Sequence, residues 1–117
     1  MRIIESSEEL RRICEAGHER KADDIVVMEM GKKSSICEFF IVMGGTSSVR
    51  VKAIVDHIED SLEKDGRRAL HKEGYQEASW VLLDYGDIIV HVFYGETRKF
   101  YDLENLWGDV RKETYLP

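Results

Sequence analysis

Few residues of this 117-residue chain have types and spacings that suit chemistry. The run Gly-Gly-Thr-Ser at 44–47 lies between a predicted strand and a predicted helix, where free N–H groups and the helix dipole favour phosphate. No Gly-Lys-Ser/Thr follows to make a P-loop, and the spacing is not the dinucleotide fingerprint. A strand end followed by a helix N-cap is the simpler interpretation. A nucleotide site that combines residues 44–48 with Asp84 stays open as the alternative.

Paired acids and nucleophiles give little support for catalysis. A glycine turn of this kind resembles that of nucleotidyltransferases, whose metal chemistry needs paired carboxylates on an adjacent strand. Asp84 and Asp87 straddle a predicted turn and would not point at a shared ion. Cys14 and Cys37 lack metal-ligand or redox spacing, and the chain has no His-x-x-x-His pair and no nucleophile elbow. We therefore expect no metal, no cofactor and no enzyme.

The segment from Trp80 to Phe93 predicts a β-hairpin with a Gly86-Asp87 turn. Period-two alternation gives one face of ordinary core residues: Val81, Leu83, Tyr85, Ile88, Val90 and Val92. The other face is also apolar, but it carries a carboxylate and an imidazole: Trp80, Leu82, Asp84, Ile89, His91 and Phe93. This second face is too apolar to be exposed to water over its whole area.

Two interpretations of the second face lead to different functions. In the first, helices cover both faces of a central sheet, and His91 is a buried histidine with a satisfied hydrogen bond. In the second, part of the face is an exposed docking surface with a polar rim. Trp80 would be its anchor, because Trp is enriched among interface hot spots.

The remaining periodicities alternate between helix and strand. A capping box of Ser6 and Glu9 predicts a helix over 7–20, and an apolar stripe predicts a long helix capped by residue 46, 47 or 48 and ended by Gly66. Asp102 opens a last helix with Leu103, Leu106, Trp107 and Val110 on one side. Strands are expected at 24–30, 37–43 and 68–71 and in the hairpin, with a connection at 31–35. The order α-β-β-α-β-β-β-α predicts an α/β protein with a mixed sheet, whose 46–66 crossover joins parallel neighbours.

Length and charge limit the class of protein. One domain over residues 1–117 can bury enough surface for a core without disulfides or metal. The net charge of −6 argues against direct binding to a nucleic-acid backbone and favours a basic protein partner. No signal peptide or membrane span is visible, so a cytoplasmic protein is expected.

From Asp23 to Trp107 the chain resembles the ribosomal silencing factor family, also called the Iojap family. The strongest signal is the ordered combination of the Trp-Val-Leu-Leu-Asp-Tyr-Gly-Asp run at 80–87 with Phe-Tyr-Asp-Leu-Glu-Asn-Leu-Trp at 100–107. The segments at 23–27, 38–42, 46–48, 53–56 and 73–74 also resemble the corresponding segments of the family. Glu38, where the family usually has Asp, and Val55, where a small residue is common, are mild departures.

The resemblance implies a nucleotidyltransferase-like fold that lacks the catalytic carboxylates. It also implies a translation repressor that binds large-subunit ribosomal protein fourteen, with little direct rRNA contact, and blocks joining of the small subunit under nutrient limitation. Homodimers are often seen in the family, and a role in large-subunit assembly is an alternative function. The docking residues expected here are those of the second hairpin face, with Arg98 and Lys99 at its rim.

Overall fold

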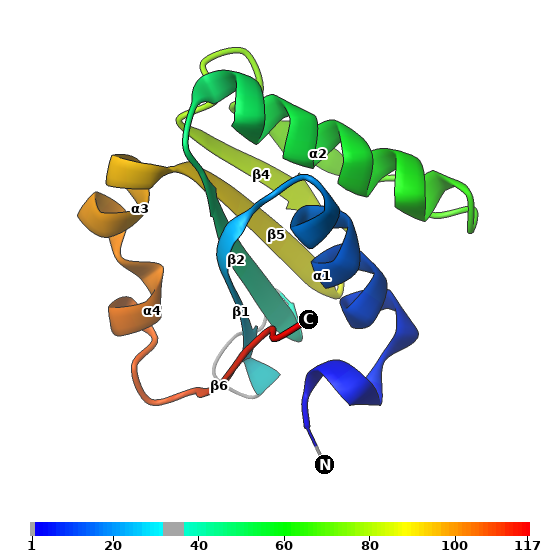
Figure 1. The fold of residues 1–117 in the computed structure, drawn as a ribbon. Helices are drawn as coiled ribbons and strands as arrows, with labels where there is room; N and C mark the ends of the chain where they lie inside the picture. Colours follow the sequence, from blue (N-terminus) through cyan, green and yellow to red (C-terminus); the bar gives the residue numbers. More distant parts are fainter. Residues whose placement is uncertain (1, 32–36) are drawn as a thin grey trace.

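The computed structural model describes residues 2–31 and 37–117, so most of the predicted 31–35 connection lies outside the described residues. The described part is a mixed α+β fold around a six-stranded sheet of order β3-β4-β5-β2-β1-β6 (Figure 1). The strands are β1 (Asp23–Glu29), β2 (Phe39–Gly45), β3 (His71–Glu73), β4 (Trp80–Asp84), β5 (Ile88–Tyr94) and β6 (Arg111–Thr114). The helices are the short η1 (Ile4–Ser6), α1 (Glu8–Glu19), α2 (Ser48–Glu63), α3 (Gly95–Tyr101) and α4 (Leu103–Leu106).

Local capping sets the ends of the two long helices. Ser7 is the N-cap of α1, since its Oγ accepts from the amide of Leu10 at 3.3 Å. The predicted capping box of Ser6 and Glu9 is therefore wrong, because the Ser6 hydroxyl donates instead to the carbonyl of Ile3 within η1. Ser47 caps α2 as predicted. Gly66 follows the end of α2 with a φ of +81°, which its missing side chain permits.

The predicted hairpin is confirmed residue by residue. Trp80 pairs with Phe93, Leu82 with His91 and Asp84 with Ile89, in the register that the alternation predicts. The amide of Tyr85 donates to the carbonyl of Ile88 at 2.9 Å and closes the turn. Because a slip of one residue would exchange the two faces, this register decides which side chains meet the helices.

The crossover prediction needs correction. β2 is parallel to β5, but α2 leads from β2 to the edge strand β3, so β4 and β5 separate the two strands that α2 connects. The short strand predicted at 68–71 begins only at His71. The strand predicted at 37–43 is shifted toward the glycines, which form its last two residues rather than its end signal.

The two sides of the sheet are covered unequally. α1 and α2 pack on the side that carries Val81, Val90 and the rest of the main core (Figure 1). The short helices α3 and α4 lie toward the other side, where a second cluster of buried residues includes Ile89, Phe93 and Leu103. No helix of the described residues is long and apolar enough to cross a bilayer.

The end of the chain differs from the prediction of one helix after Asp102. A separate helix, α3, comes first, and the chain turns at Asp102, whose φ of +45° interrupts the helix. α4 then ends at Leu106, and residues 111–114 form an edge strand against β1. Val110 is buried just before this strand rather than on a helix.

Candidate functional site

A layer of aromatic rings covers the second face of the hairpin. Trp80 stacks on Phe93 with ring centroids 5.1 Å apart and contacts Tyr101 of α3 at 4.6 Å. On the neighbouring strand Phe40 meets the ring of His91 edge-on at 4.6 Å. Aromatic pairs of this geometry stabilise the fold by more than the burial of their apolar area alone. We call this layer, with Trp107 at its margin 6.4 Å from Phe40, the aromatic face.

Burial divides the six predicted docking residues into two groups. Ile89, His91 and Phe93 are at most 7% exposed and belong to the interior. Trp80, Leu82 and Asp84 on β4 are half-buried, so their side chains reach the surface. The three residues on β5 are therefore part of the buried core, as the first interpretation of this face predicts. Of the six residues, only the three on β4 are accessible to a partner without rearrangement.

His91 is the one buried polar residue among the described parts of the chain. Its Nδ1 accepts a hydrogen bond from Trp80 Nε1 at 3.0 Å, which places the imidazole proton on Nε2. Nε2 is buried and has no hydrogen-bond partner among the described residues, so the predicted satisfaction holds for one nitrogen only. Burial in this apolar layer lowers the pKa of His91 to about 4, because the charged form loses its hydration. The ring is thus neutral near pH 7.

Asp84 serves the hairpin turn. Its Oδ1 accepts from the amide of Gly86 at 2.7 Å, which is the local bond of an Asx turn. The φ of +90° at Gly86 is a conformation that glycine adopts at little cost. The carboxylate thus fixes the turn beside the accessible part of the aromatic face.

The sequence interpretation missed two exposed apolar side chains on the short helices. Phe100 on α3 is 83% exposed and Leu106 on α4 is 70% exposed. Tyr101, which contacts Trp80, is 47% exposed. The large apolar residues at 100–107 are the sequence feature from which this exposed surface could have been predicted. Tyr101 and, through its ring contact with Tyr101, Phe100 extend the aromatic face into solvent.

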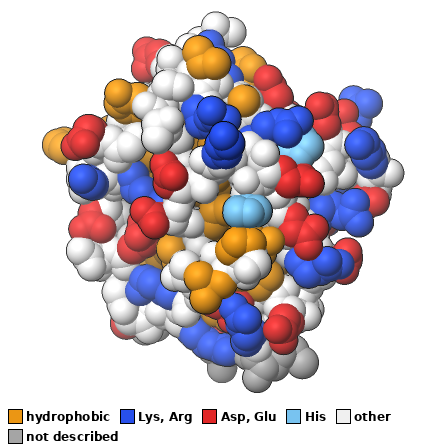
Figure 2. Space-filling view, in the orientation of Figure 1, with side chains coloured by type: hydrophobic (Ala, Val, Ile, Leu, Met, Phe, Trp, Pro, Cys, Tyr) orange, Lys and Arg blue, Asp and Glu red, His pale blue; other side chains and the backbone are white. Residues whose placement is uncertain are grey.

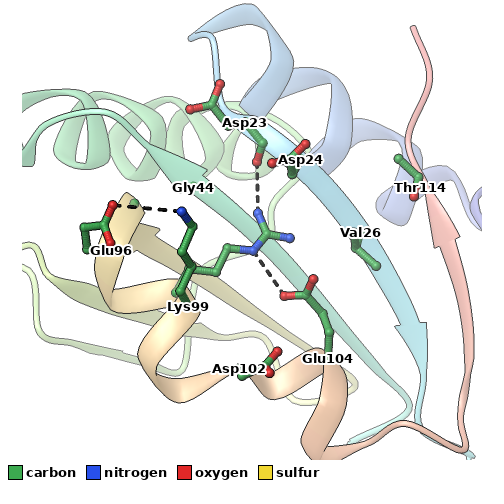
Figure 3. A pocket seen from close by; sticks show the side chains of 11 residues that line it. Asp23, Asp24, Val26, Gly44, Glu96, Lys99, Asp102, Glu104 and Thr114 are labelled. Carbon is green, nitrogen blue, oxygen red and sulfur yellow. Dashed lines mark hydrogen bonds and ion pairs between the residues drawn. The ribbon is translucent and has the colours of Figure 1, made fainter.

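The predicted rim residues Arg98 and Lys99 differ in exposure. The Lys99 side chain is 80% exposed and its Nζ lies 4.0 Å from Glu96. The Arg98 side chain is only 12% exposed, and its guanidinium group donates to the Glu104 carboxylate and to the main chain of Asp23, both labelled in Figure 3. Both line a cavity of about 480 Å³ at the start of β1, together with Asp24, Val26, Gly44, Gly95, Glu96, Asp102 and Thr114.

The suspected phosphate turn has a structural use. Ser47 Oγ accepts from the amide of Arg50 at 3.0 Å, as an N-cap does. Gly45 pairs with Tyr94 at one end of β5, whereas Asp84 pairs with Ile89 near the other end. The structure therefore does not bring residues 44–48 and Asp84 together. Within residues 2–31 and 37–117 no group of His, Cys, Asp and Glu is arranged to hold a metal ion.

Comparison with known proteins agrees with this architecture. The family model described as "Ribosomal silencing factor during starvation" matches residues 3–116. A ribosomal silencing factor from Bacillus subtilis is 38% identical over 100 residues, covering 86% of this chain and 85% of the relative. A crystal structure from Chromobacterium violaceum superimposes with a TM-score of 0.84 at 32% identity, covering all of this chain and 95% of the other. A structure from Bacillus halodurans gives 0.79 at 34% identity, covering 94% and 98%.

The described residues form a small mixed α+β fold around a six-stranded sheet, and charged side chains of both signs are interspersed over the side seen in Figure 2. The class is that of a ribosome-associated silencing protein. The chain belongs to the ribosomal silencing factor family, since the family model spans nearly its whole length. The predicted family resemblance is thereby confirmed.

Proposed function

We propose that this protein represses translation by binding the large ribosomal subunit through its protein fourteen and blocking access of the small subunit. The observation that carries the proposal is the aromatic face, where the half-buried Trp80 contacts Tyr101 and Tyr101 contacts the exposed Phe100. Aromatic groups that are partly exposed beside a buried layer are the usual anchors of protein interfaces. Family membership supplies the ribosome as the assembly concerned.

Charge supports a protein partner over bare rRNA. The net charge of −6 opposes approach to phosphates and attracts a basic ribosomal protein. Asp84 at the end of β4, Asp102 before α4 and Glu104 in α4 add carboxylates to the elements that lie next to the aromatic face. We expect direct rRNA contacts to be few. We also propose that the role is non-enzymatic and that no cofactor takes part.

The experiment is co-sedimentation with purified ribosomal subunits. The protein is expected to migrate with free large subunits and to be absent from joined ribosomes. Added before small subunits, it should lower the fraction of joined ribosomes in proportion to its occupancy of large subunits. Binding to small subunits, or equal binding to free and joined large subunits, would contradict the proposal.

A further inference from the structure

Arg98 of α3 connects α4, which follows closely along the chain, to the distant start of β1. Its Nε donates to Glu104 Oε1 and its Nη1 donates to the carbonyl oxygen of Asp23, both at 3.1 Å. Asp23 begins β1, and Glu104 lies on α4 (Figure 3). A side chain at Gly44 of β2 would lie 3.8 Å from Nη1, so the guanidinium group packs closely over the strand. One side chain thus connects the short helices to the sheet.

The short helices have few other attachments. No residue of α3 is buried, and Leu103 is the only buried residue of α4. The chain turns between the two helices at Asp102, so neither continues the other. Segments with few buried apolar contacts open locally at low cost. The bonds of Arg98 therefore add a polar attachment of α3 and α4 to the ring contact of Tyr101 and the burial of Leu103.

The position of α3 and α4 sets the accessible part of the aromatic face. Tyr101 of α3 contacts the indole of Trp80, and Phe100 is its neighbour in the same helix. If these helices moved, the exposed side chains would no longer lie beside Trp80.

We propose that Arg98 is a positioning residue, which fixes α3 and α4 against the start of β1 and so holds Phe100 and Tyr101 beside Trp80 without touching the partner. The inference rests on the proposed docking function. It replaces the rim role predicted from the sequence, because the Arg98 side chain is 12% exposed and paired with Glu104. A basic partner would also be repelled by an unpaired cation at the rim.

The test compares Arg98→Ala with the matched variant Lys99→Ala, which removes an exposed cation from the next position of the same helix. Amide hydrogen exchange of the free protein is measured over residues 95–107. Association and dissociation rates with purified large subunits are measured at several salt concentrations. A rim charge acts on the association rate and its salt dependence, whereas a positioning residue acts on the dissociation rate.

Arg98→Ala is expected to speed exchange over 95–107 and to raise the dissociation rate about tenfold, the scale of lost charge-assisted hydrogen bonds. The salt dependence of association should stay as in the wild type. Arg98→Lys should recover part of both losses, since one ammonium group cannot serve both acceptors at the same geometry. Lys99→Ala should change neither exchange nor dissociation.

Unchanged exchange in Arg98→Ala, or a change confined to association and its salt dependence, would overturn the positioning role. If Arg98→Ala does not fold, Glu104→Ala removes the same ion pair from the helix side and must show the same pattern. If the wild type does not bind large subunits, the proposed function fails, and the exchange measurement still decides whether Arg98 fixes α3 and α4.

Discussion

The indole Nε1 of Trp80 donates a hydrogen bond to Nδ1 of His91 at 3.0 Å, and this bond links the accessible edge of the aromatic face to its buried centre. Trp80 is half-buried on β4, and His91 is 4% exposed on β5. The bond requires a neutral imidazole, because a protonated Nδ1 cannot accept. The orientation of the indole is therefore coupled to the protonation state of a buried histidine.

This coupling predicts an acid-sensitive stability. The folded pKa of His91 is about 4, below its usual value near 6.5, so the unfolded chain binds a proton first as pH falls. The contribution of the neutral ring to the free energy of unfolding is complete above about pH 6.5 and is lost toward pH 4. The loss should be roughly 3 kcal/mol at most.

The measurement is the free energy of unfolding from pH 7 to 4 for the wild type and for His91→Asn. Asparagine can accept from Trp80 but does not titrate, so the variant keeps the bond and loses the pH response. Its stability should fall less steeply than that of the wild type, with carboxylates titrating equally in both. Parallel curves would show that His91 does not titrate in this range.

A second prediction concerns the N-cap of α2. Replacing Thr46 and Ser47 together by alanine removes the side-chain acceptor for the Arg50 amide. The free energy of unfolding should fall by about 1 kcal/mol, and binding to large subunits should be unchanged. Thermal shift of the wild type with ATP and Mg²⁺ is the companion measurement, because a ligand that binds the native state raises its stability. A nucleotide-dependent reaction that the double variant loses would contradict a repressor without catalysis.

A third prediction tests the charge beside the docking face. Asp84→Asn keeps an oxygen for the Gly86 amide, so the turn is retained while the charge is removed. Association with large subunits at low salt should slow about two- to fivefold, the size of an exposed ion pair. Asp60→Asn, on the exposed side of α2, is the matched control and should have no such effect. Equal slowing in both variants would mean that only net charge matters.

The hairpin could be predicted from the sequence because its information is local. Alternation with period two and a Gly-Asp turn fix the register of β4 and β5, and the stripe that ends at Leu62 fixes α2. The resemblance to the family can be detected for the same reason, because its motifs are contiguous segments in these elements and in residues 100–107.

The C-terminal part and the exposure of the aromatic face could not be predicted, because tertiary contacts decide them. α3 buries no residue, so it leaves no apolar stripe in the sequence. β6 consists of Arg-Lys-Glu-Thr and is a strand only because β1 offers an edge to pair with. Glu113 of this strand accepts from the amides of Ile3 and Ile4, a contact between the two ends of the chain. Which rings are exposed depends on where these segments pack.

The central claim is that the aromatic face binds the large subunit through Trp80. The most direct measurement is the dissociation constant for purified large subunits of the wild type, Trp80→Ala and Tyr75→Ala. Tyr75 is a matched aromatic deletion, since its hydroxyl bonds Asp56 of α2 on the opposite side of the sheet.

Trp80→Ala is expected to weaken binding by at least about 2 kcal/mol, the scale of an interface hot spot, with circular dichroism showing a folded protein. Phe100→Ala, which changes an 83% exposed side chain and leaves the core intact, should weaken binding in the same direction. Tyr75→Ala should bind as the wild type does. Wild-type affinity in both Trp80→Ala and Phe100→Ala would contradict docking through the aromatic face.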